Sequence, residues 1–225
     1  MRMTASLLLV LTSAVLLAAC QKPTPTHRTT GGREVAGEAG LAYRWTFDDV
    51  AVGSLPGNFI NVLGDWKAAA EGSAPSTPNV MRQSGRFGGP DFPRVVIEDL
   101  TFNDLTLRVR CRPESGEIDQ ACGLMFRLKD SDNYYITRAN ALEGNVRLYK
   151  VVNGSRKQFA SADLEVTSGE WHALEVRARG PELSVSWDGR EVIRATDSTF
   201  GRGKIGLWTK ADSVTAFDDL EAEGE

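Results

Sequence analysis

The chain has 225 residues, of which 41% are hydrophobic and 25% charged, and its net charge at pH 7 is −4. Its 26 basic residues form no continuous tract and are outnumbered by 30 acidic residues. Nucleic-acid binding therefore has no electrostatic basis. Some 185 residues follow position 40, enough for one domain with a substantial hydrophobic core. This part of the chain is therefore expected to form a single globular domain.

The N-terminus predicts a lipoprotein signal peptide over residues 1–19. Arg2 supplies a basic start, and the apolar run of residues 7–19 is shorter than the ~20 residues that span a bilayer. Small residues close the run, as a processing site requires. The sequence Leu17-Ala-Ala-Cys20 resembles the lipobox of bacterial lipoproteins. We therefore expect cleavage before Cys20 and attachment of diacylglycerol to its thiol.

A lipidated Cys20 would make the membrane a partner through a lipid anchor. Each buried methylene contributes ~0.8 kcal/mol, so several acyl chains hold a domain stably to one leaflet. Gln21 follows, instead of the Asp that retains enterobacterial lipoproteins at the inner membrane. We expect a cell-envelope protein at the outer membrane, facing the periplasm or the surface. Residues 20–40, rich in Pro, Thr and Gly, predict a flexible tether in which His27 is solvated.

Residues 41–225 predict an all-β fold, an antiparallel β-sandwich. Apolar and polar residues alternate in several segments, which is typical of strands with one buried face. Turn residues separate the segments, and Asp188-Gly189 marks the clearest hairpin. No segment keeps a helical apolar period for three turns. Strands are predicted at 105–112, 123–128, 134–138, 145–151, 171–179 and 182–187.

Similar segments open and close the domain. Phe47-Asp48-Asp49 lies near its start and Phe217-Asp218-Asp219 near its end. Pairing of the terminal strands would make the two segments neighbours. A structural Ca²⁺ bound by Asp48 and Asp218 is one interpretation, because calcium needs several oxygen ligands. The alternative is a set of solvated carboxylates that cap turns.

The two remaining cysteines, Cys111 and Cys122, flank the loop around Pro113–Glu117. If their strands form a hairpin, the two residues can face each other within disulfide range. An exported protein meets an oxidising compartment, in which disulfides are preserved. The alternative is a pair of buried thiols, and the bridge is the favoured prediction.

Several longer motifs resemble one superfamily. The segments are GLMFRLKDSDNYYITRAN (123–140), NVRLYK (145–150), GEWHALEVR (169–177), VSWDG (185–189) and GKIGLW (203–208). Together they resemble the concanavalin A-like lectin/glucanase superfamily, closest to laminin-G-like and 3-keto-disaccharide hydrolase-type domains. The resemblance covers residues 43–223 and implies a jelly roll that binds or acts on glycans.

One cluster of side chains has the composition of a sugar site, with aromatic faces for stacking and planar polar groups for hydroxyls. Parity places Tyr134, Arg138 and Asn140 on one face of a strand and Tyr135 on the other. The tryptophans other than Trp208 are expected in the core; they are Trp45, Trp66, Trp171 and Trp187. The predicted ligand-binding residues are Arg127, Tyr134, Arg138, Asn140, Arg147, Tyr149 and Trp208.

A catalytic centre is not evident. Glu117-Ile-Asp119 resembles part of the Glu-x-Asp-x-x-Glu motif of family 16 glycoside hydrolases, but Cys122 stands in place of the second glutamate. The segment is therefore interpreted as a loop, and His172 as a half-buried strand residue. If the chain is an enzyme, acid–base chemistry would fall to Glu143, Asp130 or Asp132.

Three functions follow from these observations. The first is a lipid-anchored module that binds carbohydrate without turning it over. The second is a glycoside or 3-keto-glycoside hydrolase or lyase, which requires a cleft with paired carboxylates. The third is a structural or protein-interaction lipoprotein of the envelope. The binding module is favoured, because the cluster provides binding groups and no complete catalytic motif accompanies it.

Overall fold

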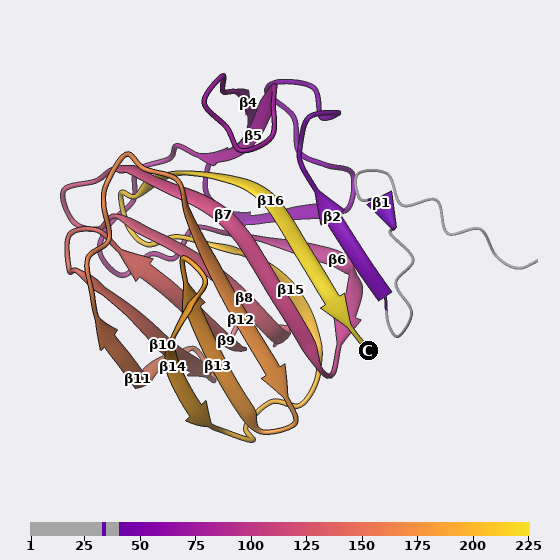
Figure 1. The fold of residues 1–225 in the computed structure, drawn as a ribbon, viewed down its shortest axis with the longest axis vertical. Coiled ribbons are helices and arrows are strands. Elements are labelled where there is room, and N and C mark those ends of the chain that lie inside the picture. The colour runs from indigo at the N-terminus through magenta and orange to yellow at the C-terminus, as the bar shows by residue number, and fades with distance from the viewer. Residues whose placement is uncertain (1–32, 35–40) are drawn as a thin grey trace, which may run out of the picture.

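Two antiparallel sheets stack face to face, as predicted (Figure 1). The computed structural model describes residues 33–34 and 41–225, and no helix occurs in this part of the chain. The predicted signal peptide, Cys20 and His27 lie outside the described residues. Within the predicted tether, Arg33–Glu34 form a two-residue strand that pairs with residues 43–44.

One sheet has nine strands, in the order β1-β2-β16-β7-β12-β13-β14, with β5 pairing with β16 and β4 with β5. The strands are β1 (Arg33–Glu34), β2 (Leu41–Trp45), β4 (Trp66–Ala70), β5 (Asn79–Gln83), β7 (Leu105–Ser115), β12 (His172–Arg179), β13 (Glu182–Trp187), β14 (Arg190–Thr196) and β16 (Val214–Gly224).

The other sheet has seven strands, in the order β11-β10-β9-β8-β15-β6-β3. The strands are β3 (Phe59–Leu63), β6 (Arg94–Phe102), β8 (Ala121–Asp130), β9 (Asn133–Asn140), β10 (Asn145–Val152), β11 (Ser155–Asp163) and β15 (Gly203–Trp208). All six strand segments predicted from the sequence are therefore strands in the structure.

The predicted hairpin at Asp188-Gly189 joins β13 to β14. Both turn residues have positive φ, 48° and 79°, which is the conformation of a two-residue type I′ turn. Asn153 and Gly154 join β10 to β11 in the same way, with φ of 50° and 76°. These turns set the register of the strands that follow them.

The main core fills the space between the sheets. On β7, Leu105, Leu107, Val109 and Cys111 alternate with polar residues and are fully buried. Aromatic rings contribute much of the buried surface, as in the stacked pair of Phe126 and Tyr135. The alternation seen in the sequence thus reports which face of each strand meets the opposite sheet.

The central strands of the seven-stranded sheet, β8 and β9, are buried on both faces. The first eight residues of β8 are all buried, as are seven of the eight residues of β9. A second apolar cluster covers the outer face of this sheet. It comprises Val96, Ala121, Met125, Leu128, Tyr134, Ile136, Tyr149, Val151 and Trp208, with Phe92 packed against it.

A disulfide joins Cys111 to Cys122, with 6.3 Å between their Cα atoms, so the predicted bridge is present. The two strands do not form a hairpin, however. Cys111 lies on β7 in the nine-stranded sheet and Cys122 on β8 in the seven-stranded sheet. The loop between the two strands crosses from one layer to the other, and the bridge connects the layers through the core.

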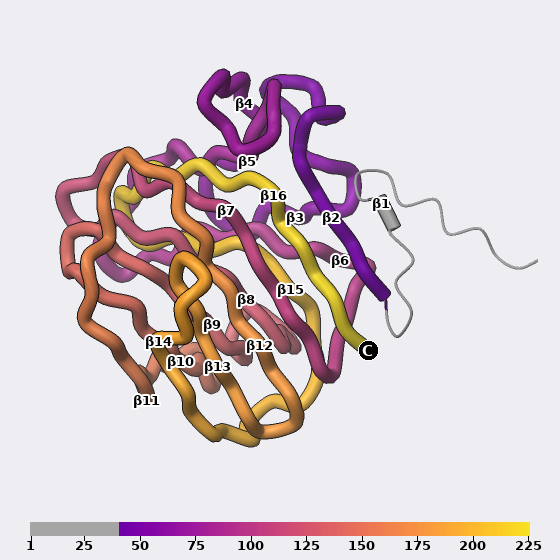
Figure 2. The backbone as a smooth tube through the Cα atoms, in the orientation of Figure 1, coloured from indigo at the N-terminus to yellow at the C-terminus, as the bar shows by residue number. Residues whose placement is uncertain are grey.

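The two ends of the domain are neighbours, as expected from their similar sequences. β2 runs antiparallel to β16, with Trp45 opposite Leu220 and Tyr43 opposite Ala222. Figure 2 shows the two segments side by side near the C-terminus. The pairing places β2 over an edge of β16 that would otherwise be open to other strands.

Candidate functional site

Six of the seven predicted ligand-binding residues meet on the outer face of the seven-stranded sheet. Tyr134, Arg138 and Asn140 lie on β9, as parity predicted. Arg147 and Tyr149 lie on β10, and the register sets Arg138 opposite Arg147. On β15, Trp208 pairs with Gly123, which pairs in turn with Arg138. The pairing of three strands therefore assembles the cluster.

Arg127 is the exception. The register of β8 against β9 shifts after Phe126, and Arg127 has a positive φ of 47°. Its guanidinium is buried at one end of the sandwich, where it donates to carbonyl oxygens of residues 103, 180 and 200. Burial lowers the pKa of Arg127. Arg127 ties loops together there and lies apart from the other six predicted residues.

Arg138 is the centre of the cluster and is only 1% exposed. One terminal nitrogen, Nη1, donates to the Asn145 side-chain oxygen. The other, Nη2, donates to Glu143 Oε2 at 2.9 Å and to the Tyr149 hydroxyl at 3.1 Å. The Nε of Arg138 has no hydrogen-bond partner among the described residues. Arg138 thus orders three side chains and retains one unused donor.

Asp119 belongs to the site, although the sequence identified it only as part of a loop. The segment is a loop, and Asp212 fixes it by accepting the backbone N–H groups of Glu117 and Asp119 at 2.7 and 3.0 Å. Asp119 accepts from Asn140 at 2.7 Å and from Lys210 Nζ at 2.8 Å. Burial raises the pKa of the Asp119 carboxyl, and Lys210 opposes this effect.

Trp208 forms the floor of the cluster and is fully buried. Gly123 permits this position, since a Cβ there would lie 3.0 Å from the indole ring. Phe92 packs over the indole with 5.5 Å between ring centroids. The guanidinium of Arg156 lies 4.7 Å from the centroids of both Phe92 and Tyr149. Phe92 and Arg156 thus cover the indole ring of Trp208.

Arg156 could have been found from the sequence. The Asn153-Gly154 turn pairs Val151 with Arg156, so parity carried through the hairpin places Arg156 on the face of Tyr149. Phe92 lies outside any strand, and no periodicity marks it. Lys210 follows the end of β15, so the alternation of side chains in a strand could not place it either.

The accessible part of the site consists of half-exposed charged groups above this floor. Arg147 donates to Glu143 at 2.8 Å. Although burial opposes it, the guanidiniums of Arg138 and Arg147 hold the pKa of Glu143 below its usual value. Arg94 lies at the other end, with its guanidinium 5.9 Å from the Tyr134 ring centroid. It also lines an adjacent depression of about 190 Å³ together with Ile60, Val62, Val96, Leu128 and Lys204.

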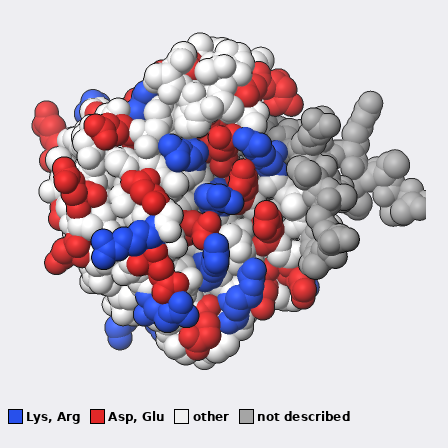
Figure 3. Space-filling model, in the orientation of Figure 1, with Lys and Arg blue, Asp and Glu red and all other residues white. Residues whose placement is uncertain are grey.

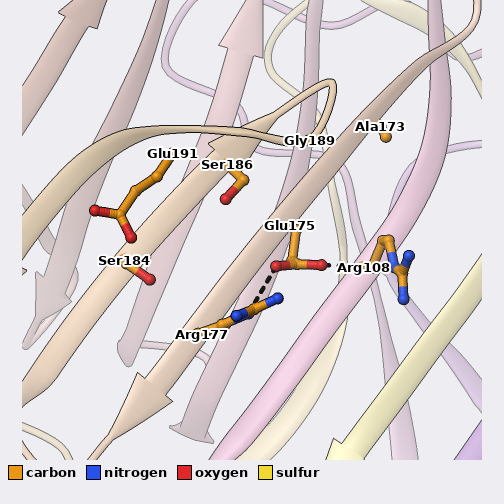
Figure 4. A pocket seen from close by; sticks show the side chains of 8 residues that line it. All are labelled: Arg108, Ala173, Glu175, Arg177, Ser184, Ser186, Gly189 and Glu191. Atoms are coloured by element: carbon orange, nitrogen blue, oxygen red, sulfur yellow. Dashed lines mark hydrogen bonds and ion pairs between the residues drawn. The ribbon is translucent and has the colours of Figure 1, made fainter.

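The outer face of the nine-stranded sheet has a different character. A depression of about 300 Å³ lies over β7, β12 and β13, where Ser184 and Ser186 leave space between charged side chains (Figure 4). Glu175 pairs there with Arg108 and Arg177. Basic and acidic residues are interspersed across this side of the molecule (Figure 3). No aromatic side chain lines this depression.

The residues considered for calcium have protein partners. Asp218 accepts from the backbone N–H and hydroxyl of Ser76 at 2.7 and 2.9 Å, and burial raises its pKa to about 6. Asp48 accepts from the Asn79 N–H at 3.1 Å. Among the described residues, no group of three or more Asp, Glu, His or Cys side chains could hold a metal ion. The calcium site remains a prediction without a supporting cluster.

The other residues considered for catalysis lie apart or serve the fold. Asp130 accepts from the Asp132 N–H and the Asn133 side chain in the β8–β9 turn. His172 is 7% exposed, stacks on Trp187 and contacts Asp188, which agrees with its interpretation as a strand residue. Trp45, Trp66 and Trp187 are buried, as expected, while Trp171 is partly exposed.

Membrane crossing by a helix has no support in the described part of the chain, which contains no helix long and apolar enough.

Known proteins share this fold. A levanase from Bacillus subtilis is 27% identical over 165 residues, which cover 72% of this chain but 22% of the levanase. The carbohydrate-binding module CBM66 from Bacillus subtilis superposes with a TM-score of 0.63 at 23% identity, covering 74% of this chain and 96% of the module. A β-glucanase from Bacillus licheniformis gives 0.52 at 13% identity, over 84% and 100%.

These neighbours show that the two-sheet sandwich is a jelly roll, the fold that the sequence resemblance implied. The model of the 3-keto-alpha-glucoside-1,2-lyase-like domain matches residues 61–223, which is most of the described chain. The chain therefore belongs to the family of 3-keto-alpha-glucoside-1,2-lyase-like domains.

Proposed function

We propose that this protein is a lipid-anchored envelope module that binds carbohydrate and does not turn it over. The observation that supports it most directly is the aromatic and arginine cluster on the outer face of the seven-stranded sheet. The partly exposed Phe92 provides a ring face, and Arg147 and Arg156 provide planar donors beside it, while the buried Tyr149 and Trp208 support them from below. Sugar sites combine these two kinds of group. The likeness to a carbohydrate-binding module agrees with this assignment.

The carboxylates of this face argue for binding without turnover. Retaining glycosidases hold two carboxyl groups about 5–5.5 Å apart and open to the substrate. Here Asp119 is fully buried between Asn140 and Lys210. Glu143 is more accessible but is engaged by Arg138 and Arg147. One accessible carboxylate held by two arginines serves binding better than acid–base chemistry.

Binding is tested by a glycan array followed by calorimetry on the full chain in detergent. Because a levanase and a β-glucanase are among the similar proteins, the set should include fructan and β-glucan oligomers. Saturable binding with unchanged sugar supports the module. Absence of binding across the array overturns it and favours the envelope-interaction alternative.

Lyase chemistry is the second candidate, because the family model is named for it. Its test is product analysis after incubation with a 3-keto-disaccharide. Cleaved product that disappears in an Asp119→Asn or Glu143→Gln variant would replace the binding proposal. The buried Asp119, whose pKa is raised, is the group whose titration such a reaction would use.

The lipid anchor is a separate part of the proposal. Metabolic labelling with palmitate should mark the wild-type protein and leave a Cys20→Ala variant unlabelled. Fractionation should then place the wild type with the outer membrane. A labelled Cys20→Ala variant would remove Cys20 as the lipidation site.

A further inference from the structure

Four arginines gather on the outer face of the seven-stranded sheet, one from each of four strands. Arg94 lies on β6, Arg138 on β9, Arg147 on β10 and Arg156 on β11. Register links them, since Arg138 is opposite Arg147 and Arg94 is opposite Trp208. Lys210 lies beside the same face, where its Nζ donates to Asp119. The concentration of positive charge is notable in a chain whose net charge is −4.

The positive charges of this face are only partly compensated. Arg138 and Arg147 share one carboxylate, Glu143, and Lys210 pairs with Asp119. Arg94 and Arg156 form no ion pair with any described residue. The opposite sheet is mixed in this respect. Its strands carry arginines that each pair with at least one carboxylate, among them Arg44, Arg108, Arg177 and Arg194, and others that form no ion pair with a described residue, Arg110, Arg179 and Arg190.

The same arginines retain unused donors. The Nε groups of Arg94, Arg138 and Arg147 and the Nη1 of Arg156 are buried without a hydrogen-bond partner in the described chain. Arg138 as a whole is 1% exposed. A buried donor without an acceptor is unfavourable, so such groups usually have a role with a water or a ligand. The described part of the nine-stranded sheet has two such arginine donors, the Nε groups of Arg82 and Arg110, whereas four gather on this face, and this concentration favours a ligand rich in acceptor oxygens.

Arg156 is held in place before any ligand arrives. Its guanidinium lies between the rings of Phe92 and Tyr149 and 5.9 Å from the centroid of Trp208. Contact with aromatic faces restrains the long side chain and leaves its edge free for in-plane hydrogen bonds. A guanidinium edge matches a carboxylate or sulfate group, to which it donates two parallel bonds.

We infer that the ligand is an acidic carbohydrate, a sugar carrying carboxylate or sulfate groups that Arg156, Arg147 and Arg94 recognise. This inference rests on the proposed carbohydrate-binding function and specifies its ligand class. The sugar ring contacts the partly exposed Phe92, while the anionic group pairs with the arginine edges.

The test compares matched ligands by calorimetry on the full chain in detergent. One pair is oligogalacturonate and the same oligomer after carboxyl reduction. The other is dextran sulfate and dextran. The wild type should bind the acidic member of at least one pair about tenfold more tightly than its neutral counterpart, because charge-assisted hydrogen bonds are stronger than neutral ones. This preference should weaken as salt is raised.

Arg156→Gln should reduce the preference by about tenfold, since it removes a charged donor but keeps a planar group. Arg194→Gln is the matched control, because this arginine is an exposed residue of β14 on the opposite sheet. It should leave the preference unchanged. Equal loss in both variants, or no loss in either, overturns the assignment to these arginines.

The outcomes separate this inference from the proposed function. If neutral fructans or glucans bind and neither acidic ligand is preferred, carbohydrate binding stands and the acidic ligand class is wrong. If no glycan binds, acidic or neutral, the proposed function fails and the inference fails with it. The comparison in the wild type needs no variant, so it remains decisive even if Arg156→Gln is unstable.

Discussion

The outer faces of the two sheets carry arginines in opposite settings. On the nine-stranded sheet, Arg108 is 47% exposed and reaches Glu175 and Glu221 through water-accessible ion pairs. On the seven-stranded sheet, Arg138 is buried and holds Asn145, Glu143 and Tyr149 together. The first arrangement keeps a sheet face soluble. The second builds a shaped, charged surface, at the expense of burying guanidinium groups.

The difference arises from what covers each face. The nine-stranded sheet meets solvent, so its outer residues are polar and its strands alternate cleanly. Phe92 and Arg156 fold over the seven-stranded sheet, so β8 and β9 are buried on both faces. Arg138 cannot be exchanged without loss, because two of its partners, Asn145 and Tyr149, are buried with it.

The largest expected effect is on stability. Arg138→Met should lower the free energy of unfolding by about 3 kcal/mol, because it leaves buried hydrogen-bonding groups unpaired. Urea denaturation monitored by tryptophan fluorescence measures the change. Arg138 therefore cannot serve as a mutation that tests binding alone. An effect below about 1 kcal/mol would show that the two sheet faces tolerate the loss of an arginine equally.

The disulfide couples the two faces through the core. Replacing Cys111 and Cys122 together with Ser should cost about 2–3 kcal/mol, since the unfolded chain gains conformational freedom. Reduced and oxidised wild-type protein, compared by the same urea titration, provide the control. A loss confined to the double variant, with no change on reduction, would assign the effect to the serines and not to the bridge.

The contributions of one carboxyl group near each sheet to stability should also change in opposite directions with pH. Hydrogen bonds from Ser73 and Arg112 lower the pKa of Glu71 from 4.5 to about 2. Its contribution to stability is thus present above pH 4.5 and is lost as the pH falls through about 2. Glu71→Gln should therefore be destabilised most at neutral pH, and the gap to the wild type should close on acidification.

Asp119, near the other sheet, has a raised pKa, so the sign is reversed. Its contribution is present below its unfolded pKa and is lost as the pH rises through its folded value. The Tm of Asp119→Asn relative to the wild type should consequently increase as the pH rises from acid to neutral. Thermal melts of both variants between about pH 3 and pH 8 measure the two trends. Parallel trends in the two variants would contradict the contrast.

The smallest effect is expected on the solvated face. Arg108→Ala should change the free energy of unfolding by less than about 1 kcal/mol, because exposed ion pairs contribute little and are screened by salt. Repeating the urea titration in high salt should reduce the difference further. A loss as large as that of Arg138→Met would mean that this face depends on its ion pairs for stability.

Sequence patterns predicted the strands because their periodicity reflects local geometry. Alternation in residues 105–112 and 171–179 marks one buried face, and Asp188-Gly189 supplies the φ angles that a tight hairpin requires. Parity also grouped Tyr134, Arg138 and Asn140 correctly. It did so because side chains two residues apart share a face in any regular strand. A shift of register interrupts that rule, as between Phe126 and Asp130 on β8.

Other features depend on pairings between segments far apart in the chain. Cys111 and Cys122 are separated by 11 positions, yet they lie on different sheets, and spacing alone favoured a hairpin. Asp119 became part of the site because Asn140 and Lys210 reach it, and Phe92 because it packs on Trp208. Such contacts follow from the path of loops over the sheet, which carries no periodic signal.

The sequence alone predicted the β-sandwich, six of its strands and the grouping of Tyr134, Arg138 and Asn140 on one strand face, because local periodicity and turn chemistry encode them. It also predicted a lipidated Cys20, which remains to be tested. Only the tertiary structure decided which arginines are paired and which retain free donors. That outcome depends on burial and on partners brought together by strand register and loop packing, and neither quantity exists until the chain has folded.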